Sequence, residues 1–468
     1  MEPADFRKYG HEFIDWLADY FENIEDYPVK PDVQPGDILS LLPKTPPQQG
    51  EPMEDIFRDF KKDIMPGMTH WQHPGWFAFF PANNSPESVL AELLTAGLGA
   101  QCMIWQTSPA AAELEQQVME WLRQMLQLPD SFTGVIQDTA SSATLAALLS
   151  AREARSDYQI NKKGFTGKLA VYSTAETHSS IEKGVKIAGY GKEQLRTIPT
   201  GNDFAMLPDK LEEAILVDIR QGITPTCVVA SLGTTSSMAM DPVAAIAEIC
   251  RKYDVWLHVD AAMAGTAAMV PELAGFFKGT EQADSFVFNP HKWMMVNFDC
   301  SAYFVKDVGK LVRTFEINPE YLKSATDNQV NNYRDWGVQL GRRFRALKLW
   351  FVLRSYGVEG IRQMVRRHVA LARSFEQWVN EDPRFELLAP VNLSLVCFRY
   401  NPGGMDEEAL AALNRKVLDQ VNLSGKVYLT HTSLKGRYAI RLSVGQRTTT
   451  QKQVQLAWDL LREAAEKM

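Results

Sequence analysis

The sequence is poor in several features that mark particular classes of protein. Its 468 residues include five cysteines, scattered and without a C-x-x-C pair, which excludes a disulfide framework and predicts reduced core thiols of a cytoplasmic protein. No G-x-G-x-x-G or G-x-x-x-x-G-K-[ST] pattern occurs, which argues against a dinucleotide or P-loop site. Neither a basic and apolar leader nor a sustained apolar run is present, so we expect no signal peptide and no membrane span.

Positive charge is also scarce relative to negative charge. The chain carries 49 lysines and arginines against 57 aspartates and glutamates, a formal net charge of −8. Such a chain lacks the basic field that attracts a nucleic-acid backbone, so we expect no nucleic-acid partner. We interpret the one basic run, residues 342–345, as a helix start with internal ion pairs. His70 and His73 lack a third ligand, so we expect no metal site.

The remaining composition is that of a large globular protein. Hydrophobic residues make up 45% and charged residues 23%, close to the usual averages, and the length predicts about three domains. We place these at residues 1–83, 84–346 and 347–468, of which the last is a small α+β region. Near the start, Phe6, Phe13 and Tyr20 recur at intervals of seven on an amphipathic helix. That helix packs either on its own core or against a second subunit.

The middle of the chain alternates β-branched or aromatic strands with helices. This pattern predicts an α/β fold whose mostly parallel sheet is covered on both faces. Helices are predicted at 110–128, 140–155 and 242–253, the last with Asp241 as its N-cap and Pro242 at its first position. Strands are predicted at 168–173, 226–232, 255–259, 285–288 and 301–305, and near the C-terminus at 393–400, 426–430 and 438–444.

Side chains able to carry chemistry follow four of the predicted strands. His178 follows the first and Thr235 the second. Asp260 follows the third, and Lys292 the fourth, within Asn289-Pro290-His291-Lys292-Trp293. In open α/β sheets, ligands bind outside the carboxyl ends of the strands. We therefore expect an imidazole, a hydroxyl, a carboxylate and an amine to meet in one pocket.

This set of groups matches the needs of pyridoxal phosphate. The cofactor requires a lysine for a Schiff base and an acid beside its pyridine nitrogen. Its phosphate suits a helix N-terminus, and Thr139-Ala140-Ser141 stands at the start of a predicted helix. Taken singly, Lys292 would be an ordinary surface lysine and Asp260 a turn former, while His178 would be a core histidine. Their order and spacing together favour the cofactor site.

Four segments resemble the pyridoxal-phosphate-dependent aromatic L-amino-acid decarboxylases, and the resemblance extends over nearly the whole chain. It implies a fold-type-I, aminotransferase-like homodimer with an N-terminal helical dimerisation segment, a large cofactor-binding domain and a small C-terminal domain. The segments are Met65-Pro66-Gly67-Met68-Thr69-His70-Trp71, His258-Val259-Asp260-Ala261-Ala262, Asn289-Pro290-His291-Lys292-Trp293 and Gly341-Arg342-Arg343-Phe344-Arg345.

The resemblance also implies roles for individual residues. Lys292 would carry the cofactor, Asp260 would pair with its pyridine nitrogen, and His178 would stack on its ring. Tyr321 matches the family's loop tyrosine, which is thought to deliver a proton to the substrate. The remaining implied cofactor contacts are Thr139, Ala140, Thr235, Asn289 and His291.

The implied substrate contacts lie mainly in an aromatic segment. At three positions the sequence departs from the family: Phe79 replaces a common tyrosine, Ala82 a threonine and Met103 a phenylalanine. These departures remove the basis for a catechol preference and leave the reaction class unchanged. Gly341 matches the small residue typical of aromatic decarboxylases. The implied contacts are Trp71, Phe79, Phe80, Pro81, Met103 and Gly341.

We therefore expect a cytoplasmic homodimer that converts an aromatic L-amino acid (L-DOPA, tyrosine, tryptophan or phenylalanine) to its arylalkylamine and CO₂. One alternative is an aromatic aldehyde synthase, which couples decarboxylation to oxidative deamination; such relatives tend to carry phenylalanine in place of Tyr321. A glutamate decarboxylase is disfavoured by the apolar pocket. A cofactor-free scaffold is disfavoured because Lys292 and Asp260 are both present.

Overall fold

The computed structural model describes residues 1–165, 167–317 and 329–468. Its centre is a seven-stranded sheet in the order β1-β7-β6-β5-β4-β2-β3. β7 pairs antiparallel with both of its neighbours, and the other pairs are parallel, which confirms the mostly parallel sheet. The strands are β1 (Thr133–Gln137), β2 (Leu169–Thr174), β3 (Leu195–Ile198), β4 (Thr224–Ser231), β5 (Trp256–Asp260), β6 (Ser285–Phe288) and β7 (Ser301–Val305).

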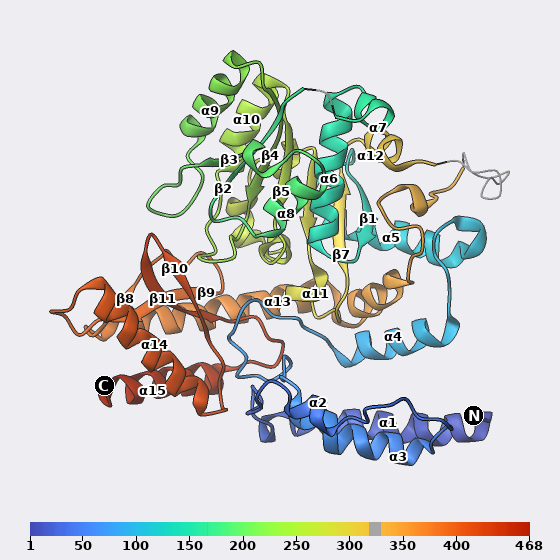
Figure 1. The fold of residues 1–468 in the computed structure, drawn as a ribbon, viewed down its shortest axis with the longest axis vertical. Coiled ribbons are helices and arrows are strands. Elements are labelled where there is room, and N and C mark those ends of the chain that lie inside the picture. Colours follow the sequence, from blue (N-terminus) through green and yellow to red (C-terminus); the bar gives the residue numbers. More distant parts are fainter. Residues whose placement is uncertain (166, 318–328) are drawn as a thin grey trace.

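Helices cover both faces of this sheet (Figure 1). Successive strand side chains point to opposite faces, so Val228 packs with one group of helices and Val229 with the other. Because the strands of a parallel sheet are buried on both faces, their sequences are nearly continuous apolar runs. The first group is α5 (Pro109–Met125), α9 (Pro208–Arg220) and α10 (Val243–Tyr253), and the second is α6 (Ala140–Arg155), α8 (Ser180–Ile187) and α12 (Val308–Phe315).

The N-terminal helices lie below the body of the molecule in Figure 1. They are α1 (Pro3–Glu22), α2 (Asp37–Leu41) and α3 (Met53–Asp59). The aromatic stripe of α1 packs partly on α3, with the ring centroids of Phe13 and Phe57 4.5 Å apart. No residue of α1 is buried, however, and Phe6 is 66% exposed. One chain therefore covers only part of the stripe.

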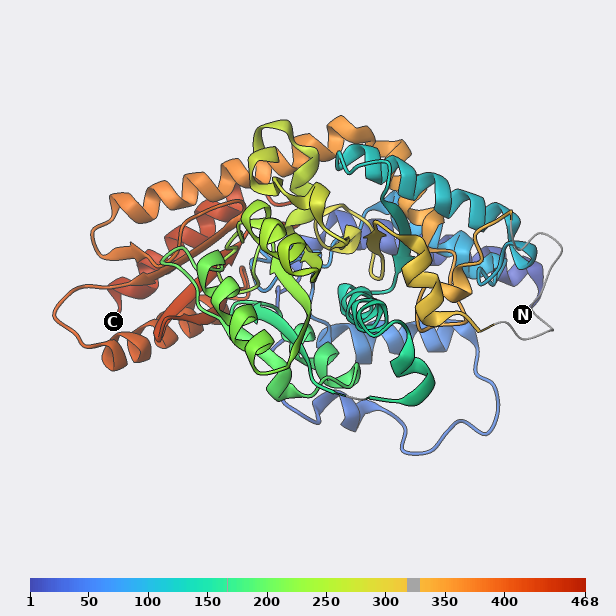
Figure 2. The ribbon, with the colours of Figure 1, turned by 90° about the horizontal axis from the view of Figure 1, so that it is seen from above.

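A four-stranded antiparallel sheet, ordered β10-β11-β9-β8, forms the C-terminal part. Seen from above in Figure 2, α13 (Arg345–Glu381) extends from this sheet along the body, where it contacts α4 (Pro86–Leu98) and α5. The small α+β region is thus confirmed, while the divisions at residues 83 and 346 stay a prediction. Its other elements are β8 (Phe385–Leu387), β9 (Leu395–Tyr400), α14 (Glu407–Leu423), β10 (Thr430–Leu434), β11 (Arg437–Ser443) and α15 (Gln451–Glu466).

One prediction near this region is wrong in position. The strand expected at 426–430 begins only at Thr430, because the backbone of Tyr428 bonds instead to residues 75 and 77 of the N-terminal segment. The basic run at 342–345 stands at the start of α13 as expected, with Phe344 as the N-cap residue and Arg345 as the first helical residue. Its arginines do make internal ion pairs, and Arg342 lies 2.6 Å from the carboxylate of Glu115.

Asp241 is not the N-cap of α10, contrary to the sequence pattern. The helix begins at Val243, after Pro242. The Asp241 carboxylate accepts hydrogen bonds from the backbone N–H groups of Met206 at 2.8 Å and Ser231 at 2.7 Å, and burial raises the pKa of Asp241 to about 6. Asp241 therefore anchors the end of β4. No helix in the described ranges is long and apolar enough to cross a bilayer.

Candidate active site

A pocket of about 200 Å³ opens at the carboxyl ends of β4, β5 and β6, beside the N-terminus of α6. This is the edge where an α/β sheet collects ligand-binding side chains. Each buried strand ends at this edge, so the residues at or just after its carboxyl end lie at the pocket. The predicted residues that line the pocket are Phe80, Thr139, Ala140, His178, Thr235, Asp260, Asn289, His291 and Lys292.

Lys292 reaches the pocket from α11 (Pro290–Trp293), a single helical turn that follows β6. Pro290 suits the first helical position because its φ angle is already helical. The Lys292 ammonium lies 5.4 Å from the centroid of the Phe80 ring. Burial lowers the pKa of Lys292, and the Asp260 carboxylate opposes that shift. A lowered pKa enlarges the neutral fraction that can act as a nucleophile.

Asp260 ends β5 and is largely buried. Its carboxylate accepts a hydrogen bond from the backbone N–H of Ala262 at 3.0 Å. Two residues earlier on the same strand, the ring nitrogens of His258 contact the hydroxyls of Ser285 at 2.9 Å and Thr144 at 3.3 Å. Burial lowers the pKa of His258 to about 4. The imidazole next to Asp260 is therefore neutral at pH 7 and adds no competing positive charge.

His178 follows β2 and is oriented by Ser180. The backbone N–H of Ser180 donates to His178 Nδ1 at 3.2 Å, and the Ser180 hydroxyl lies 2.8 Å from the same nitrogen. Because Nδ1 accepts a hydrogen bond, the proton of the neutral ring lies on Nε2. Burial lowers the pKa of His178, Lys292 lowers it further, and Asp260 opposes both. The pocket therefore contains a flat, neutral ring.

The N-terminus of α6 forms a further wall. Thr139 is its N-cap residue but makes no side-chain bond to the helix, and its hydroxyl lies 3.2 Å from the Asp138 carboxylate. The first N–H groups of a helix lack intrahelical acceptors and attract anions. Asn289, which also lines the pocket, has a buried side-chain oxygen without a partner among the described residues. An unsatisfied buried polar atom is costly, so this amide has unused hydrogen-bonding capacity at the pocket.

The turn that carries Thr235 is held from the C-terminal sheet. Arg441 of β11, largely buried, donates from Nη2 to the Thr235 carbonyl at 2.7 Å and from Nε to the Ser236 carbonyl at 3.1 Å. Its Nη1 donates to the Thr430 hydroxyl at 3.0 Å. The guanidinium also lies 5.6 Å from the Phe80 ring centroid. Burying a cation among neutral acceptors costs free energy. The hydrogen bonds that Arg441 makes in return fix the turn on one side of the pocket.

His291 and Phe298 lie together at another side of the pocket. The Cys300 backbone N–H donates to His291 Nδ1 at 2.9 Å. The His291 ring centroid is 4.7 Å from that of Phe298. Burial lowers the pKa of His291 to about 3. The ring is thus neutral with its proton on Nε2, so Nε2 is available as a donor.

The predicted substrate residues are divided. Phe80 lines the pocket, whereas Trp71 packs against Trp76 in a tilted pair, with 4.2 Å between ring centroids, and Phe79 is 49% exposed. Gly341 lies in a separate surface hollow beside Gln101. Tyr321 lies outside the described residues. The predicted residues that do not line this pocket within the described part of one chain are Trp71, Phe79, Pro81, Met103 and Gly341.

Two residues that the sequence analysis missed hold the site in place. The Asn83 side-chain amide donates to the carbonyls of Lys292 at 2.7 Å and Gly445 at 2.6 Å, and its oxygen accepts from the Arg447 backbone N–H at 2.9 Å. Asn83 stands among polar neighbours, so nothing in the sequence distinguishes it. Arg441 does carry a signal, because it is a lone arginine inside the apolar strand predicted at 438–444.

The donor set of this pocket fits pyridoxal phosphate. A lysine with a lowered pKa, a strand-end carboxylate and a helix N-terminus are the groups that its aldehyde, pyridine nitrogen and phosphate require. The unused hydrogen-bonding capacity of Asn289 also favours a bound group with polar atoms. Within the described ranges, no group of three or more His, Cys, Asp or Glu side chains is placed to hold a metal ion.

Known proteins share this architecture over the full length. A family model described as "Pyridoxal-dependent decarboxylase conserved domain" matches residues 35–401. Tyrosine decarboxylase 4 of Petroselinum crispum is 43% identical over 100% of this chain and 94% of its own length. Phenylacetaldehyde synthase of Arabidopsis thaliana is 43% identical over 99% of this chain and 96% of its own.

Solved structures agree with these sequence matches. The structure of Oryza sativa TDC with PLP and tryptamine aligns with a TM-score of 0.97 at 38% identity, covering 100% of this chain and 99% of that one. This likeness confirms the predicted fold class, and the family match confirms the cofactor and the carboxy-lyase class. The chain therefore belongs to the pyridoxal-dependent decarboxylase family.

Proposed function

We propose that this chain acts as a cytoplasmic homodimer that decarboxylates an aromatic L-amino acid to its arylalkylamine and CO₂. The observation that carries the proposal is the meeting of the Lys292 amine, the Asp260 carboxylate and the α6 N-terminus in one pocket. Full-length similarity to a tyrosine decarboxylase supports the choice of an aromatic substrate. When bound, pyridoxal phosphate supplies an electron sink for the electron pair left by the departing CO₂.

The residues of the chain bind and orient the reactants. Lys292 would hold the cofactor through its side-chain amine and would place a neutral amine near the reacting carbon. Asp260 keeps a proton on the pyridine nitrogen, because a carboxylate beside a protonated nitrogen stabilises the positive charge. The neutral ring of His178 offers a flat surface for stacking. The groups that support the phosphate and the edge of the ring are Thr139, Ala140, Thr235, Asn289 and His291.

The positions of the predicted substrate contacts support the proposal that a second copy of the chain completes the site. Phe80 supplies an aromatic wall within one chain, but Met103 and Gly341 lie away from that pocket. Helix α4 also exposes a row of large apolar side chains, and exposed apolar patches mark interaction surfaces. A symmetric contact between two copies would bring the same residues to both sites. The exposed large apolar residues of α4 are Leu90, Leu93, Leu94 and Leu98.

The reaction also needs a proton at the carbon that loses CO₂. By resemblance we assign this proton to the phenol of Tyr321, which lies outside the described residues. The residue at position 321 would therefore decide between amine and aldehyde. A phenol can donate the proton that yields the amine, whereas a phenyl ring cannot donate a proton. We expect Tyr321→Phe to lower amine formation and to divert turnover, with consumption of O₂ and water, to aldehyde, ammonia and hydrogen peroxide. Unchanged amine formation in this variant would refute the role.

An aldehyde synthase is the second candidate function. Its support is the 43% identity to phenylacetaldehyde synthase, which equals the identity to tyrosine decarboxylase 4. Overall similarity therefore does not separate the two activities, and the presence of Tyr321 favours the amine product.

One product screen tests the proposal and its alternative together. The cofactor-loaded enzyme is supplied with L-DOPA, tyrosine, tryptophan, phenylalanine, glutamate and histidine, and CO₂, amine, aldehyde and peroxide are measured. We expect an aromatic substrate to give amine and CO₂ in equal amounts without peroxide. Peroxide and aldehyde in place of amine would establish the synthase, and preferred turnover of glutamate would overturn the aromatic assignment.

A further inference from the structure

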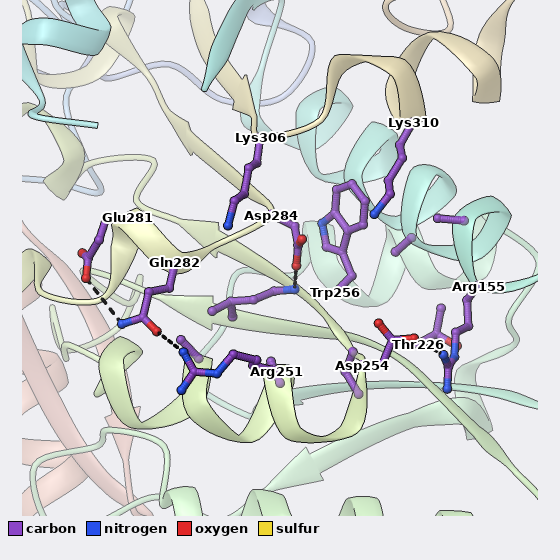
Figure 3. Close-up of a pocket in the computed structure, with 16 residues that line it drawn as sticks. Arg155, Thr226, Arg251, Asp254, Trp256, Glu281, Gln282, Asp284, Lys306 and Lys310 are labelled. Carbon is purple, nitrogen blue, oxygen red and sulfur yellow. Dashed lines mark hydrogen bonds and ion pairs between the residues drawn. The ribbon is translucent and has the colours of Figure 1, made fainter. Parts of the chain in front are cut away.

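A second, larger hollow lies at the amino ends of the same strands (Figure 3). We name it the amino-end cleft; it is lined by the first residues of β5, the segment before β6, the residues after β7 and the last turns of α6 and α10. Its volume is about 460 Å³, against about 200 Å³ for the cofactor pocket. The hollow exists because α6 and α10 present the small side chains of Ala151, Ala154 and Ala247 to it. Its size is that of a small-molecule site.

Cationic side chains surround the amino-end cleft. Arg155 pairs with Asp254 at 2.5 Å, and Arg251 donates weakly to Gln282 at 3.4 Å. Lys306 and Lys310 form no ion pair within 4 Å among the described residues, although Figure 3 shows both reaching into the cleft on either side of Asp284. Three of the four cations thus form no ion pair with a carboxylate in the part of the chain that the structure describes.

The Asp284 carboxylate lies between the two lysines and also serves the fold. Its carboxylate accepts a hydrogen bond from the Leu257 backbone N–H at 2.8 Å, which ties the loop before β6 to β5 (Figure 3). Burial also raises the pKa of Asp284, and Lys310 and Lys306 oppose that shift. The remaining carboxylate in the lining, that of Glu281, accepts from Gln282 at 3.4 Å and from the Gly279 backbone N–H at 2.9 Å.

The floor of the cleft is apolar and fixed. Trp256 is largely buried, its indole N–H donates to the Ser285 hydroxyl at 2.9 Å, and the Lys310 ammonium lies 5.8 Å from its ring centroid. Cys250 and Leu257 are buried beside it. The floor thus offers a limited apolar contact, while most of the exposed lining of the cleft is polar.

We propose that the amino-end cleft binds a small organic anion, with its phosphate or carboxylate between Lys306 and Lys310 and a flat apolar body against the Trp256 floor. Two lysines that form no ion pair within the described ranges suit a compact anionic group. The cleft lies at the opposite edge of the sheet from the cofactor pocket, so its ligand does not compete with the cofactor. The proposal is independent of the identity of the substrate.

Calorimetric titration of the cofactor-loaded enzyme tests this proposal. Phenyl phosphate is the probe, and benzoate and inorganic phosphate are the companion titrants. The variant is Lys306→Ala/Lys310→Ala, and the charge-matched control is Lys162→Ala/Lys278→Ala, whose lysines are exposed elsewhere. Because all four lysines are at the surface or half-buried, both variants are expected to fold, which circular dichroism checks.

We expect one phenyl phosphate per chain, bound at least about tenfold more weakly by the cleft variant and equally by the control. Affinity should also fall as salt is raised, because the contact is ionic. Tighter binding of benzoate would identify the group as a carboxylate, and tighter binding of phenyl phosphate would identify a phosphate. The proposal is overturned if neither phenyl phosphate nor benzoate binds, if the cleft variant binds the tighter of the two as well as the control does, or if inorganic phosphate binds equally well.

Discussion

The cofactor side and the substrate side of this site differ in how the chain builds them. On the cofactor side, each functional group follows directly from the end of a buried strand, and one chain brings them all into one pocket. On the substrate side, Phe80 is the one predicted contact that the described part of one chain brings there, while Phe79 and Gly341 stand at its surface. The cofactor side therefore follows mainly from the strand ends of one chain, whereas we propose that substrate choice also depends on contacts with a second copy. Substitutions on the cofactor side should therefore lower activity and cofactor affinity, whereas those on the substrate side should change substrate preference.

The largest effect is expected on the cofactor side, at Asp260. Asp260→Asn removes the negative charge at the end of β5, and breaking a buried charge pair costs about 3 kcal/mol or more, which is more than about a hundredfold in kcat/KM. We expect weaker cofactor binding as well, measured by fluorescence titration of the apoenzyme. Asp209→Asn, at an exposed position, is the control. If Asp260→Asn kept full activity and cofactor affinity, Asp260 would have no role on this side.

A smaller effect is expected where the two sides are joined, at Asn83. Asn83→Ala leaves the carbonyls of Lys292 and Gly445 and the N–H of Arg447 without their buried partner. We expect the free energy of unfolding to fall by about 3 kcal/mol, measured by urea denaturation. Asn84→Ala is a matched control, because no described hydrogen bond uses its side chain. Equal losses in the two variants would show that the Asn83 contacts contribute nothing special.

The smallest effect is expected on the substrate side, at Gly341. A Cβ there would approach only the flexible Gln101 amide, at 3.3 Å, so Gly341→Ser should fold normally. We expect the ratio of kcat/KM between two aromatic substrates to change by a few-fold to about a hundredfold, because one small group in a pocket alters discrimination by about 1–3 kcal/mol. Cofactor affinity should not change. A variant that loses cofactor and keeps its substrate preference would remove the distinction between the two sides.

The sequence predicts those features whose signals are local. The ends of β5 and β6 are marked by apolar runs that stop at Asp260 and Asn289, and both strands lie where expected. Long-range contacts have no such mark. Asp241 looks like a helix cap from its neighbours, but the fold places unsatisfied N–H groups of Met206 and Ser231 beside it.

The same limit applies to the residues around the pocket. The link between Asn83 and Gly445 spans 362 positions, and that between Arg441 and Thr235 spans 206. The pattern of apolar residues around one partner carries no sign of the other partner, so no local pattern predicts the pair. Arg441 alone was detectable, as a charge inside an apolar strand, because a buried cation must find acceptors somewhere.

The visible absorption band of the lysine–cofactor bond tests the central assignment most directly. Spectra of the purified protein with pyridoxal phosphate are compared with those of Lys292→Ala and of Lys183→Ala, a control lysine on α8. We predict that Lys292→Ala loses the band and that Lys183→Ala retains it, because Lys292 is the lysine that lines the pocket with Asp260. An unchanged band in Lys292→Ala would contradict the account.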